Sequence, residues 1–428
     1  MRAVRGAFFG WHVVGAAFVI AVFAWGIGFY GPPIFLTVLH DTRGWPVPLV
    51  SAAITAHFLL GAVAVANLAA LHRRFGVATT TRAGALLTAL GLLGWAFAHE
   101  PWQLFLATPV SGAGWALTSG AALNAMVSPW FIRRRAAALS MAFNGASMGG
   151  VLFSPLWAAL IGRAGFAWAA VLVAAALVLV VWFLAGRYLG RSPAAMGLAP
   201  DGGPQSGRHP PVPHRAAAHA APLPRPWRDR RFVTLAIASM LGLFAQVGLV
   251  AHLFSLLVPV LGEAGSGLTI GAATACAIAG RSLLARLMPP AADRRLVAAA
   301  NVALQAVGSG VLLWAGPSVP LVLLGCGLFG LGLGNVTSLP PLIAQSEFNA
   351  PDVSRVVALV TAVSQAGYAF APAAFGLLRE PGIVPGTASS PGHAPLLFAA
   401  AAAIQLAAAA VVLLGRRAVP QGKAVPAG

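Results

Sequence analysis

Long apolar runs alternate with short polar segments along the chain. Twelve such runs can be drawn, each close to the ~20 residues that an α-helix needs to cross a bilayer. They cover residues 11–39, 48–71, 77–98, 102–127, 136–161 and 167–189, then 232–260, 267–288, 296–315, 318–343, 354–378 and 394–415. The pattern therefore predicts an all-α membrane protein with twelve transmembrane helices.

The arginines are unevenly divided between the two sets of connecting segments. One set, with both chain ends, holds Arg2, Arg5, Arg73, Arg74, Arg82, Arg133, Arg134, Arg135, Arg294, Arg295, Arg355, Arg416, Arg417 and Lys423. The other set holds only Arg43, Arg163 and Arg379. By the positive-inside rule, both termini are expected in the cytoplasm of a multi-pass protein of the cell inner (plasma) membrane. The first helix is expected to stay in place as the insertion signal.

A segment rich in proline and arginine interrupts the pattern at residues 190–231. Its composition predicts a semi-rigid or disordered cytoplasmic linker, because it cannot bury apolar surface. The expected domains are a six-helix bundle at 1–189, the linker at 190–231, and a second six-helix bundle with a short tail at 232–428. The linker histidines have no standard metal-site spacing, so no metal is expected; they are His209, His214 and His219.

The two halves share local sequence features. A run that starts at Arg135 in the first half matches one that starts at Arg355 in the second, and each leads to a glycine and then a proline, Pro155 or Pro372. Internal duplication of six helices predicts two pseudo-symmetric bundles with a site at their interface.

Composition narrows the class of protein. The chain has 428 residues, of which 59% are hydrophobic and 8% are charged, and these values exclude an ordinary soluble domain. A net charge of +18 could suit nucleic acid, but the basic residues lie in short loops and form no stripe. The expected partner is therefore the lipid bilayer, with no nucleic acid. Cys276 and Cys326 lie within apolar runs and are interpreted as reduced packing residues.

Arg281 is the most unusual residue in the pattern, since it lies inside the apolar run 268–288. A guanidinium in that position costs at least ~2.5–3.5 kcal/mol. The chain has nine acidic residues, and none falls within a predicted membrane core. Arg281 is therefore expected to face a water-filled cavity and to bind an anion that passes through. The alternative is that it bonds helix carbonyls or amide side chains on facing helices.

Three further residues are candidates within the membrane. The glycines and prolines of 26–33 predict a break in the first helix, with Tyr30 directed into the cavity; a kink shaped for packing is the alternative. His57 and His252 are the candidate proton carriers, because no core carboxylate is available. For each histidine the alternative is a neutral ring that makes one bond between helices.

Several motifs resemble those of the major facilitator superfamily. They are the loop 71–76 followed by Arg82 and Gly84, its second copy from Gly280 to Arg295, the segment Trp130–Ser140, the Gly44-Trp45 pair, and the segment Pro193–Gly202. The last three are similar to the monocarboxylate and oxalate–formate antiporter branches. The resemblance implies gating loops at Arg73, Arg74, Asp293 and Arg294. It also implies that Asn144 and Gln365 contact substrate, because helices 5 and 11 line the cavity in this family.

The chain also departs from the family pattern. Arg73 occupies a position where the first gating loop usually has an aspartate. Pro33 and Ala277 replace the substrate-binding lysine and the proton-coupling aspartate of monocarboxylate transporters. Of the charged residues that monocarboxylate transporters carry at these membrane positions, only the helix 8 arginine, Arg281, is retained.

The sequence thus favours a secondary transporter that moves a small solute, a small organic anion of the monocarboxylate type, by alternating access. It is expected to act as a monomer, with a coupling proton or a counter-anion and without a cofactor. Proton symport, exchange and uniport all fit the sequence. A multidrug or metabolite exporter of the same superfamily is the alternative within transport. A membrane enzyme is disfavoured, because the chain has no paired carboxylates, metal-ligand cluster or Gly-x-Ser-x-Gly motif, and no Gly-Lys-Ser/Thr supports ATP use.

Overall fold

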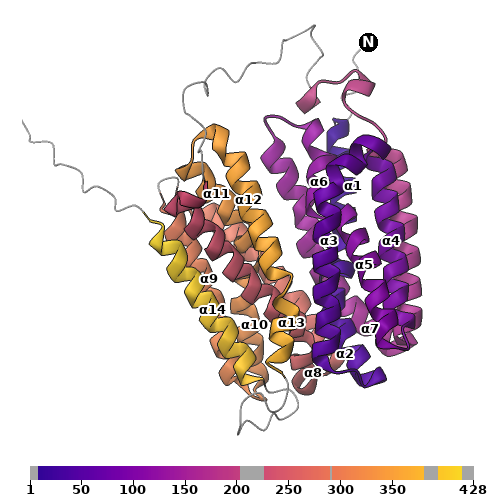
Figure 1. Cartoon of the computed structure of the whole chain (residues 1–428), viewed down its shortest axis with the longest axis vertical. Helices are drawn as coiled ribbons and strands as arrows, with labels where there is room; N and C mark the ends of the chain where they lie inside the picture. Colours follow the sequence, from indigo (N-terminus) through magenta and orange to yellow (C-terminus); the bar gives the residue numbers. More distant parts are fainter. Residues whose placement is uncertain (1–7, 203–225, 290–291, 380–393, 417–428) are drawn as a thin grey trace, which may run out of the picture.

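The helices form two bundles that lie side by side (Figure 1). The computed structural model describes residues 8–202, 226–289, 292–379 and 394–416. The first bundle contains α1 (Phe9–Gly28), α2 (Gly31–Arg43), α3 (Val47–Phe75), α4 (Val77–Phe97), α5 (Pro101–Thr118), α6 (Gly120–Val127) and α7 (Arg135–Leu184). The second contains α8 (Arg230–Leu287), α9 (Arg294–Ala315), α10 (Val319–Leu333), α11 (Asn335–Glu347), α12 (Ala350–Tyr368), α13 (Ala371–Leu377) and α14 (Pro395–Leu414). Short turns complete the described chain: η1 (Ser128–Trp130), η2 (Ala185–Leu189), η3 (Ala194–Met196), η4 (Pro200–Gly202) and η5 (Pro226–Arg228).

The predicted all-α membrane architecture is confirmed. Within the described ranges, nine helical segments are long and apolar enough to cross a membrane. The segments that contain α7 and α8 hold two predicted crossings each, joined at Gly165 and Gly262, where φ is 75° and 68°. Glycine suits these positions because other residues rarely adopt such angles. The remaining predicted crossing, 102–127, is divided into α5 and α6 at Ser119.

The first predicted helix is broken where its glycines and prolines lie. α1 ends at Gly28 and α2 begins at Gly31, because Pro32 has no N–H to continue the helical ladder to the Gly28 carbonyl. Side chains take over the carbonyl groups that the break releases. The indole N–H of Trp157 donates to Gly26 O at 3.1 Å, and Nε2 of His57 lies 3.1 Å from Gly28 O.

Three other breaks were not predicted. They divide the expected helices 102–127, 318–343 and 354–378 at Ser119, Gly334 and Phe370. Pro372 explains the last of these, because it has no N–H for the helical bond to the carbonyl of Tyr368. Each of these three expected runs is thus divided into two shorter helices.

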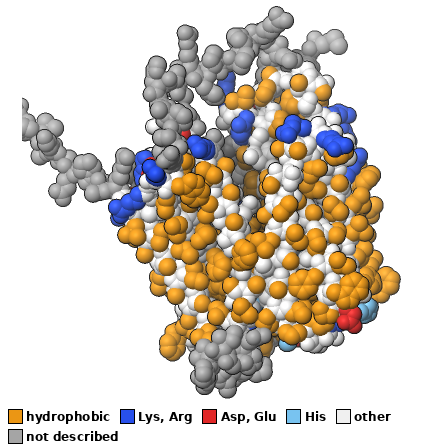
Figure 2. All heavy atoms as spheres, viewed as in Figure 1, with side chains coloured by type: hydrophobic (Ala, Val, Ile, Leu, Met, Phe, Trp, Pro, Cys, Tyr) orange, Lys and Arg blue, Asp and Glu red, His pale blue; other side chains and the backbone are white. Residues whose placement is uncertain are grey.

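The bundles meet at one end and diverge toward the other. They diverge at the end named here the arginine-rich end, which carries the connections before α4, α7 and α9 and where arginine side chains gather (Figures 1 and 2). At the opposite end, the N–H of Ala373 on α13 donates to Thr55 Oγ1 on α3 at 3.1 Å. A Cβ on Gly376 would lie 2.6 Å from Ser51 Oγ, so the helices touch closely there.

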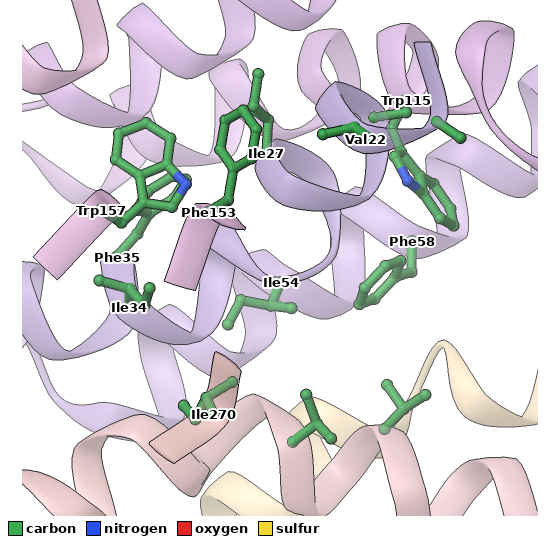
Figure 3. Close-up of a cluster of buried hydrophobic side chains, with 14 of the residues drawn as sticks. Val22, Ile27, Ile34, Phe35, Ile54, Phe58, Trp115, Phe153, Trp157 and Ile270 are labelled. Carbon is green, nitrogen blue, oxygen red and sulfur yellow. The ribbon is translucent and has the colours of Figure 1, made fainter. Parts of the chain in front are cut away.

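The main hydrophobic cluster runs through the first bundle and reaches the second. In Figure 3, Trp157 and Phe35 pack edge to face, with ring centroids 4.9 Å apart, and Ile270 of α8 lies across from Ile54. A smaller cluster fills the arginine-rich half of the second bundle, around Phe232 and Ile343. The boundary between the bundles is therefore largely apolar near the opposite end, with the Ala373–Thr55 hydrogen bond within it, and the polar group described next lies at the same boundary nearer the arginine-rich end.

Candidate functional site

Arg281 is the centre of the candidate site. It lies in α8 about 9 Å from the end of that helix at Leu287, by the helical rise per residue, and it is half-buried. Its Nη1 donates to Asn144 Oδ1 at 2.9 Å, and its Nη2 and Nε donate to the Gly334 carbonyl at 3.2 and 3.4 Å. Asn144 is in α7, so the first of these bonds joins the two bundles. Two residues predicted separately are thus in direct contact.

The second acceptor of Arg281 lies at the junction between two helices. Gly334 connects α10 to α11, and a Cβ there would lie 2.8 Å from Arg281 Nη2. The absence of a side chain at this position therefore lets the guanidinium reach the backbone. Nearby, Asn301 Nδ2 donates to Gly332 O, and Asn335 Nδ2 donates to Asn301 Oδ1. The side-chain amides of Asn301 and Asn335 thus hydrogen-bond near the junction between α10 and α11, and the junction's carbonyl at Gly334 binds the guanidinium.

Tyr30 joins the same group from the break between α1 and α2. Its hydroxyl hydrogen-bonds Thr274 of α8, and it is close enough to Arg281 for an electrostatic interaction. A Cβ on Gly150 of α7 would lie 2.6 Å from Tyr30 Cζ and 2.7 Å from Thr274 Oγ1. Tyr30, Asn144 and Arg281 are therefore assembled from three elements at the boundary between the bundles.

Aromatic rings adjoin this polar group. Phe29 packs against Tyr30 with centroids 5.1 Å apart, and Phe58 packs against Trp115 at 5.4 Å. Tyr368 of α12 reaches Phe58 across the boundary at 5.8 Å. Gln365, the fourth predicted substrate ligand, hydrogen-bonds Tyr368, and in the described part of the chain no bond joins it to Arg281. Gln365 thus lies with the aromatic rings and not with the polar group around Arg281.

Arg281 has only neutral partners among the residues that the structure describes. Its three hydrogen bonds go to an amide oxygen and a backbone carbonyl, and two of its five N–H groups make no further bond within that part. These contacts are those of the structural alternative stated from the sequence. They also leave the positive charge without a resident carboxylate, and a planar guanidinium binds a carboxylate in a bidentate manner. The arrangement can accept an anion in exchange for a neutral acceptor.

The two candidate histidines are fully buried, and each is bonded to a carbonyl near a helix break. Besides Gly28 O, His57 contacts Ser111 through Nδ1, with 2.8 Å to Oγ. Nε2 of His252 lies 3.0 Å from the carbonyl oxygen of Pro372, at the start of α13. Nδ1 of His252 is buried without a partner among the described residues. Both histidines therefore make the interhelical bond expected of the neutral form. In His252, Nδ1 remains able to accept a proton.

The two gating loops differ in structure. Asp293 accepts the N–H groups of Arg295 and Leu296 at the start of α9, and Arg416 pairs with it at 2.6 Å. Although partial burial alone raises the pKa of Asp293, the bonds to Leu296 N–H and Arg416 lower it below its usual range. In the first loop, Arg73 and Arg74 are exposed, and the structure shows neither in an ion pair with a described residue.

A larger network beside Asp293 was missed from the sequence. Arg294 donates to Leu342 O, while Arg295 is 1% exposed and uses all five N–H groups. They reach both carboxylate oxygens of Glu347, the carbonyls of Arg231 and Val412, and Thr234 Oγ1. The signal was present as a doubled arginine in the loop, but the position of Glu347 at the end of α11 could not be paired with it from spacing alone.

No metal site is formed by the part of the chain that the structure describes, since it brings no three His, Cys, Asp or Glu side chains together. The polar group around Arg281 consists of one cation, a phenol, a hydroxyl and an amide. Such groups bind and orient a solute.

Comparisons with known proteins agree with this architecture. The family model of the Major Facilitator Superfamily matches residues 14–372. Monocarboxylate transporter 13 of Bos taurus is 37% identical over 107 residues, which cover 25% of this chain and 25% of that transporter. Monocarboxylate transporter 11 of Mus musculus is 31% identical over 174 residues, covering 39% of this chain and 37% of that transporter. The chain therefore matches only a quarter to just over a third of these relatives' lengths.

Solved structures are similar over almost the whole chain. A bacterial homologue of the human lysosomal transporter Spinster, in an inward-facing and occupied conformation, has a TM-score of 0.69 at 15% identity and covers 99% of this chain and 100% of its own. The nucleoside transporter NupG also has a TM-score of 0.69, at 10% identity, and covers 95% of this chain and 100% of its own. At these identities the likeness concerns the fold alone.

Proposed function

This chain belongs to the major facilitator superfamily of transporters, and from that premise we propose that it moves a small organic anion across the membrane by alternating access. The observation that carries the proposal is Arg281, a half-buried cation between the bundles whose described partners are all neutral. Charges inside membrane helices are costly and usually functional. An anion at this position offsets the cost of the buried charge.

The bond between Arg281 and Asn144 suggests how binding is coupled to movement. Because it joins α8 to α7, it holds the two bundles together at the site. A carboxylate that binds the guanidinium competes with Asn144 Oδ1 and the Gly334 carbonyl for the same N–H groups. Loading the site thus replaces a contact between bundles by a contact with cargo, and this exchange allows the bundles to rock around the bound anion.

The surroundings favour a single negative charge on a largely apolar molecule. No second arginine or lysine hydrogen-bonds the group of Tyr30, Asn144 and Arg281 in the described ranges. Phe29, Phe58 and Tyr368 adjoin it. The names of the similar monocarboxylate transporters support this cargo class.

The arginine-rich end faces the cytoplasm, as the distribution of basic residues predicts, so the bundles meet at the outer end and diverge toward the cytoplasm. The gating loops at Arg73, Arg74, Asp293 and Arg294 then lie on the cytoplasmic face of the plasma membrane. The protein works as a monomer, and His57 or His252 carries a proton if transport is proton-coupled.

Binding to the purified protein tests the cargo class. We compare benzoate with acetate, succinate and the neutral benzamide, which matches benzoate in shape and lacks its charge. Benzoate should bind most tightly, since it supplies one carboxylate and an apolar body. Acetate should bind more weakly, and benzamide and succinate should not compete.

Binding of the neutral benzamide as tight as that of benzoate would favour the second candidate, an exporter of apolar metabolites. The ring contacts that link Trp115, Phe58 and Tyr368 are the observation that supports it. Equal binding of benzamide and benzoate would show that the rings bind cargo without help from Arg281, and would end the anion proposal.

A further inference from the structure

The segment that follows α7 folds back onto the arginine-rich end of the first bundle. We name residues Ser192–Gly202 the strap. It contains η3 and η4, and Met196 and Leu198 pack against the main hydrophobic cluster. Within it, Ser192 Oγ accepts the N–H of Ala195 at 3.2 Å, and Leu198 N–H donates to the carbonyl of Pro193 at 2.9 Å. This part of the linker is therefore an ordered element of the first bundle.

The strap ends at a carboxylate that binds three consecutive backbone N–H groups. Asp201 Oδ2 accepts from Arg133 at 2.8 Å and from Ile132 at 3.1 Å, and Oδ1 accepts from Arg134 at 3.3 Å. These groups lie immediately before α7, whose N-cap residue, Arg134, offers no side-chain acceptor. The first N–H groups of a helix need an external acceptor. Asp201 therefore binds the N–H of the N-cap residue of α7, Arg134, and the two N–H groups before it, from 67 to 69 residues away in the chain.

The backbone of Asp201 supports a specific role for this contact. Its φ is 64°, and it is the one residue other than glycine with a positive φ in the described ranges. A left-handed conformation costs energy for a residue with a Cβ and persists where surrounding contacts hold it. The three hydrogen bonds to its carboxylate are such contacts.

Charge also favours this position. Arg133, Arg134 and Arg135 are exposed next to the carboxylate, and no other described acidic residue lies at the arginine-rich end of the first bundle. Slight burial alone raises the pKa of Asp201, but the three backbone N–H donors and the charge of Arg133 outweigh it and lower the pKa below its usual range. A lowered pKa means that the cap is present at neutral pH and is lost only as the pH falls through that low value. The strap is thus permanently charged under physiological conditions.

The second bundle has a carboxylate of its own at the arginine-rich end. There, Asp293 of the gating loop caps α9 through two N–H groups. The corresponding loop of the first bundle has Arg73 and Arg74 and no carboxylate. We propose that Asp201 is a positioning residue, by which the strap supplies a carboxylate to the loop before α7, whereas the gating loop of the first bundle, before α4, has none. It fixes the loop that leads into α7, the helix that carries Asn144 of the candidate site.

Hydrogen exchange of the purified full-length protein tests the cap. Asp201→Gly removes the carboxylate and also relieves the strain of a positive φ, so the turn itself can persist. The N–H groups of Ile132, Arg133 and Arg134 should then exchange about 5- to 30-fold faster, which corresponds to the usual worth of a helix cap. Asp201→Asn keeps one acceptor oxygen and should give an intermediate rate.

Asp229→Gly is the matched control, because Asp229 caps α8 at the other end of the linker through the N–H of Arg231. It should speed exchange at the start of α8 and leave residues 132–134 unchanged. Unaltered exchange at 132–134 in Asp201→Gly would overturn the proposal, since the turn and not the carboxylate would then hold the loop.

Transport in proteoliposomes separates positioning from a purely structural role. With benzoate or whichever carboxylate binds, Asp201→Gly should lower the maximal rate about fivefold and leave KM within about twofold, because Asn144 lies about 13 Å further along α7. Asp201→Asn should restore part of the rate. An unchanged rate would limit Asp201 to a structural cap and contradict the positioning role. If no carboxylate binds at all, the cargo proposal fails and the exchange measurement still decides the cap.

Discussion

Two arginines of the second bundle are both withdrawn from solvent, yet their surroundings differ. Arg295 is 1% exposed, has all five N–H groups bonded, and shares two of those bonds with the carboxylate of Glu347. Arg281 is half-buried between the bundles, and its described acceptors are an amide and a backbone carbonyl. The first arginine has its counter-charge within the chain, and the second does not.

The difference indicates that Arg295 stabilises the fold, whereas Arg281 is available to bind a ligand. Removing one member of a buried pair leaves an uncompensated charge, so the Arg295–Glu347 pair resists change. The neutral acceptors of Arg281 lose less when it leaves, because a carbonyl or an amide can bond to water or to another side chain. A cation held by neutral groups is thus suited to exchange partners during a transport cycle.

The largest effect is expected at Arg295. Arg295→Met leaves Glu347 unpaired and should lower the free energy of unfolding by about 3 kcal/mol. Melting temperature and yield of purified protein measure it, and anion affinity in the surviving protein should be unchanged. Arg416→Gln is the control, because the Asp293–Arg416 pair is 35–40% exposed and is worth less than about 1 kcal/mol. Equal losses in the two variants would remove the distinction drawn for Arg295.

The next effect concerns proton coupling, which cannot use a carboxylate beside Arg281. If uptake depends on a proton gradient, the double variant His57→Gln, His252→Gln should lose that dependence, while uptake driven by the anion gradient remains. Glutamine keeps a hydrogen-bonding group near each carbonyl, so the helix breaks should survive. Uptake that stays fully proton-driven in the double variant would exclude both histidines as carriers.

The smallest effect is expected in the middle of the linker. Residues 203–214 lie outside the described residues, and the caps by Asp201 and Asp229 lie on either side of them. Deleting ten residues there should leave the melting temperature and the transport rate nearly unchanged, because the networks at the arginine-rich end are formed within each bundle. A large loss of folded protein would show that this stretch contributes to the fold.

Much of the fold followed from the sequence because apolar periodicity and glycine–proline clusters act locally. The break at 26–33 could be predicted, since three glycines and two prolines lie within eight residues. The breaks at Ser119 and Gly334 could not, because each lies in an apolar run without a proline beside the break. They depend on tertiary contacts, such as the approach of Arg281 to the Gly334 carbonyl.

The site was predictable to a similar extent. Arg281 was conspicuous as a charge in an apolar run, and Asn144 and Gln365 were named by resemblance. Contact with Asn144 depends on how α7 and α8 meet, and Gln365 bonds Tyr368 instead. The roles of Glu347 and Asp201 were missed, because both act across long sequence separations and neither lies within a membrane run.

The central claim is that Arg281 binds the transported anion, and the anion-induced shift in melting temperature tests it most directly. For the wild-type protein, saturating benzoate should raise the melting temperature, since a ligand that binds only the folded state stabilises it. Arg281→Gln should fold with a similar melting temperature and show a much smaller shift, with affinity reduced about 10- to 100-fold, as expected for the loss of a charged hydrogen bond. Arg281→Lys, which keeps the charge and loses the planar fork, should show a weak shift at most. A normal benzoate shift in Arg281→Gln, accompanied by a lowered melting temperature without ligand, would contradict the account and make Arg281 a structural strut.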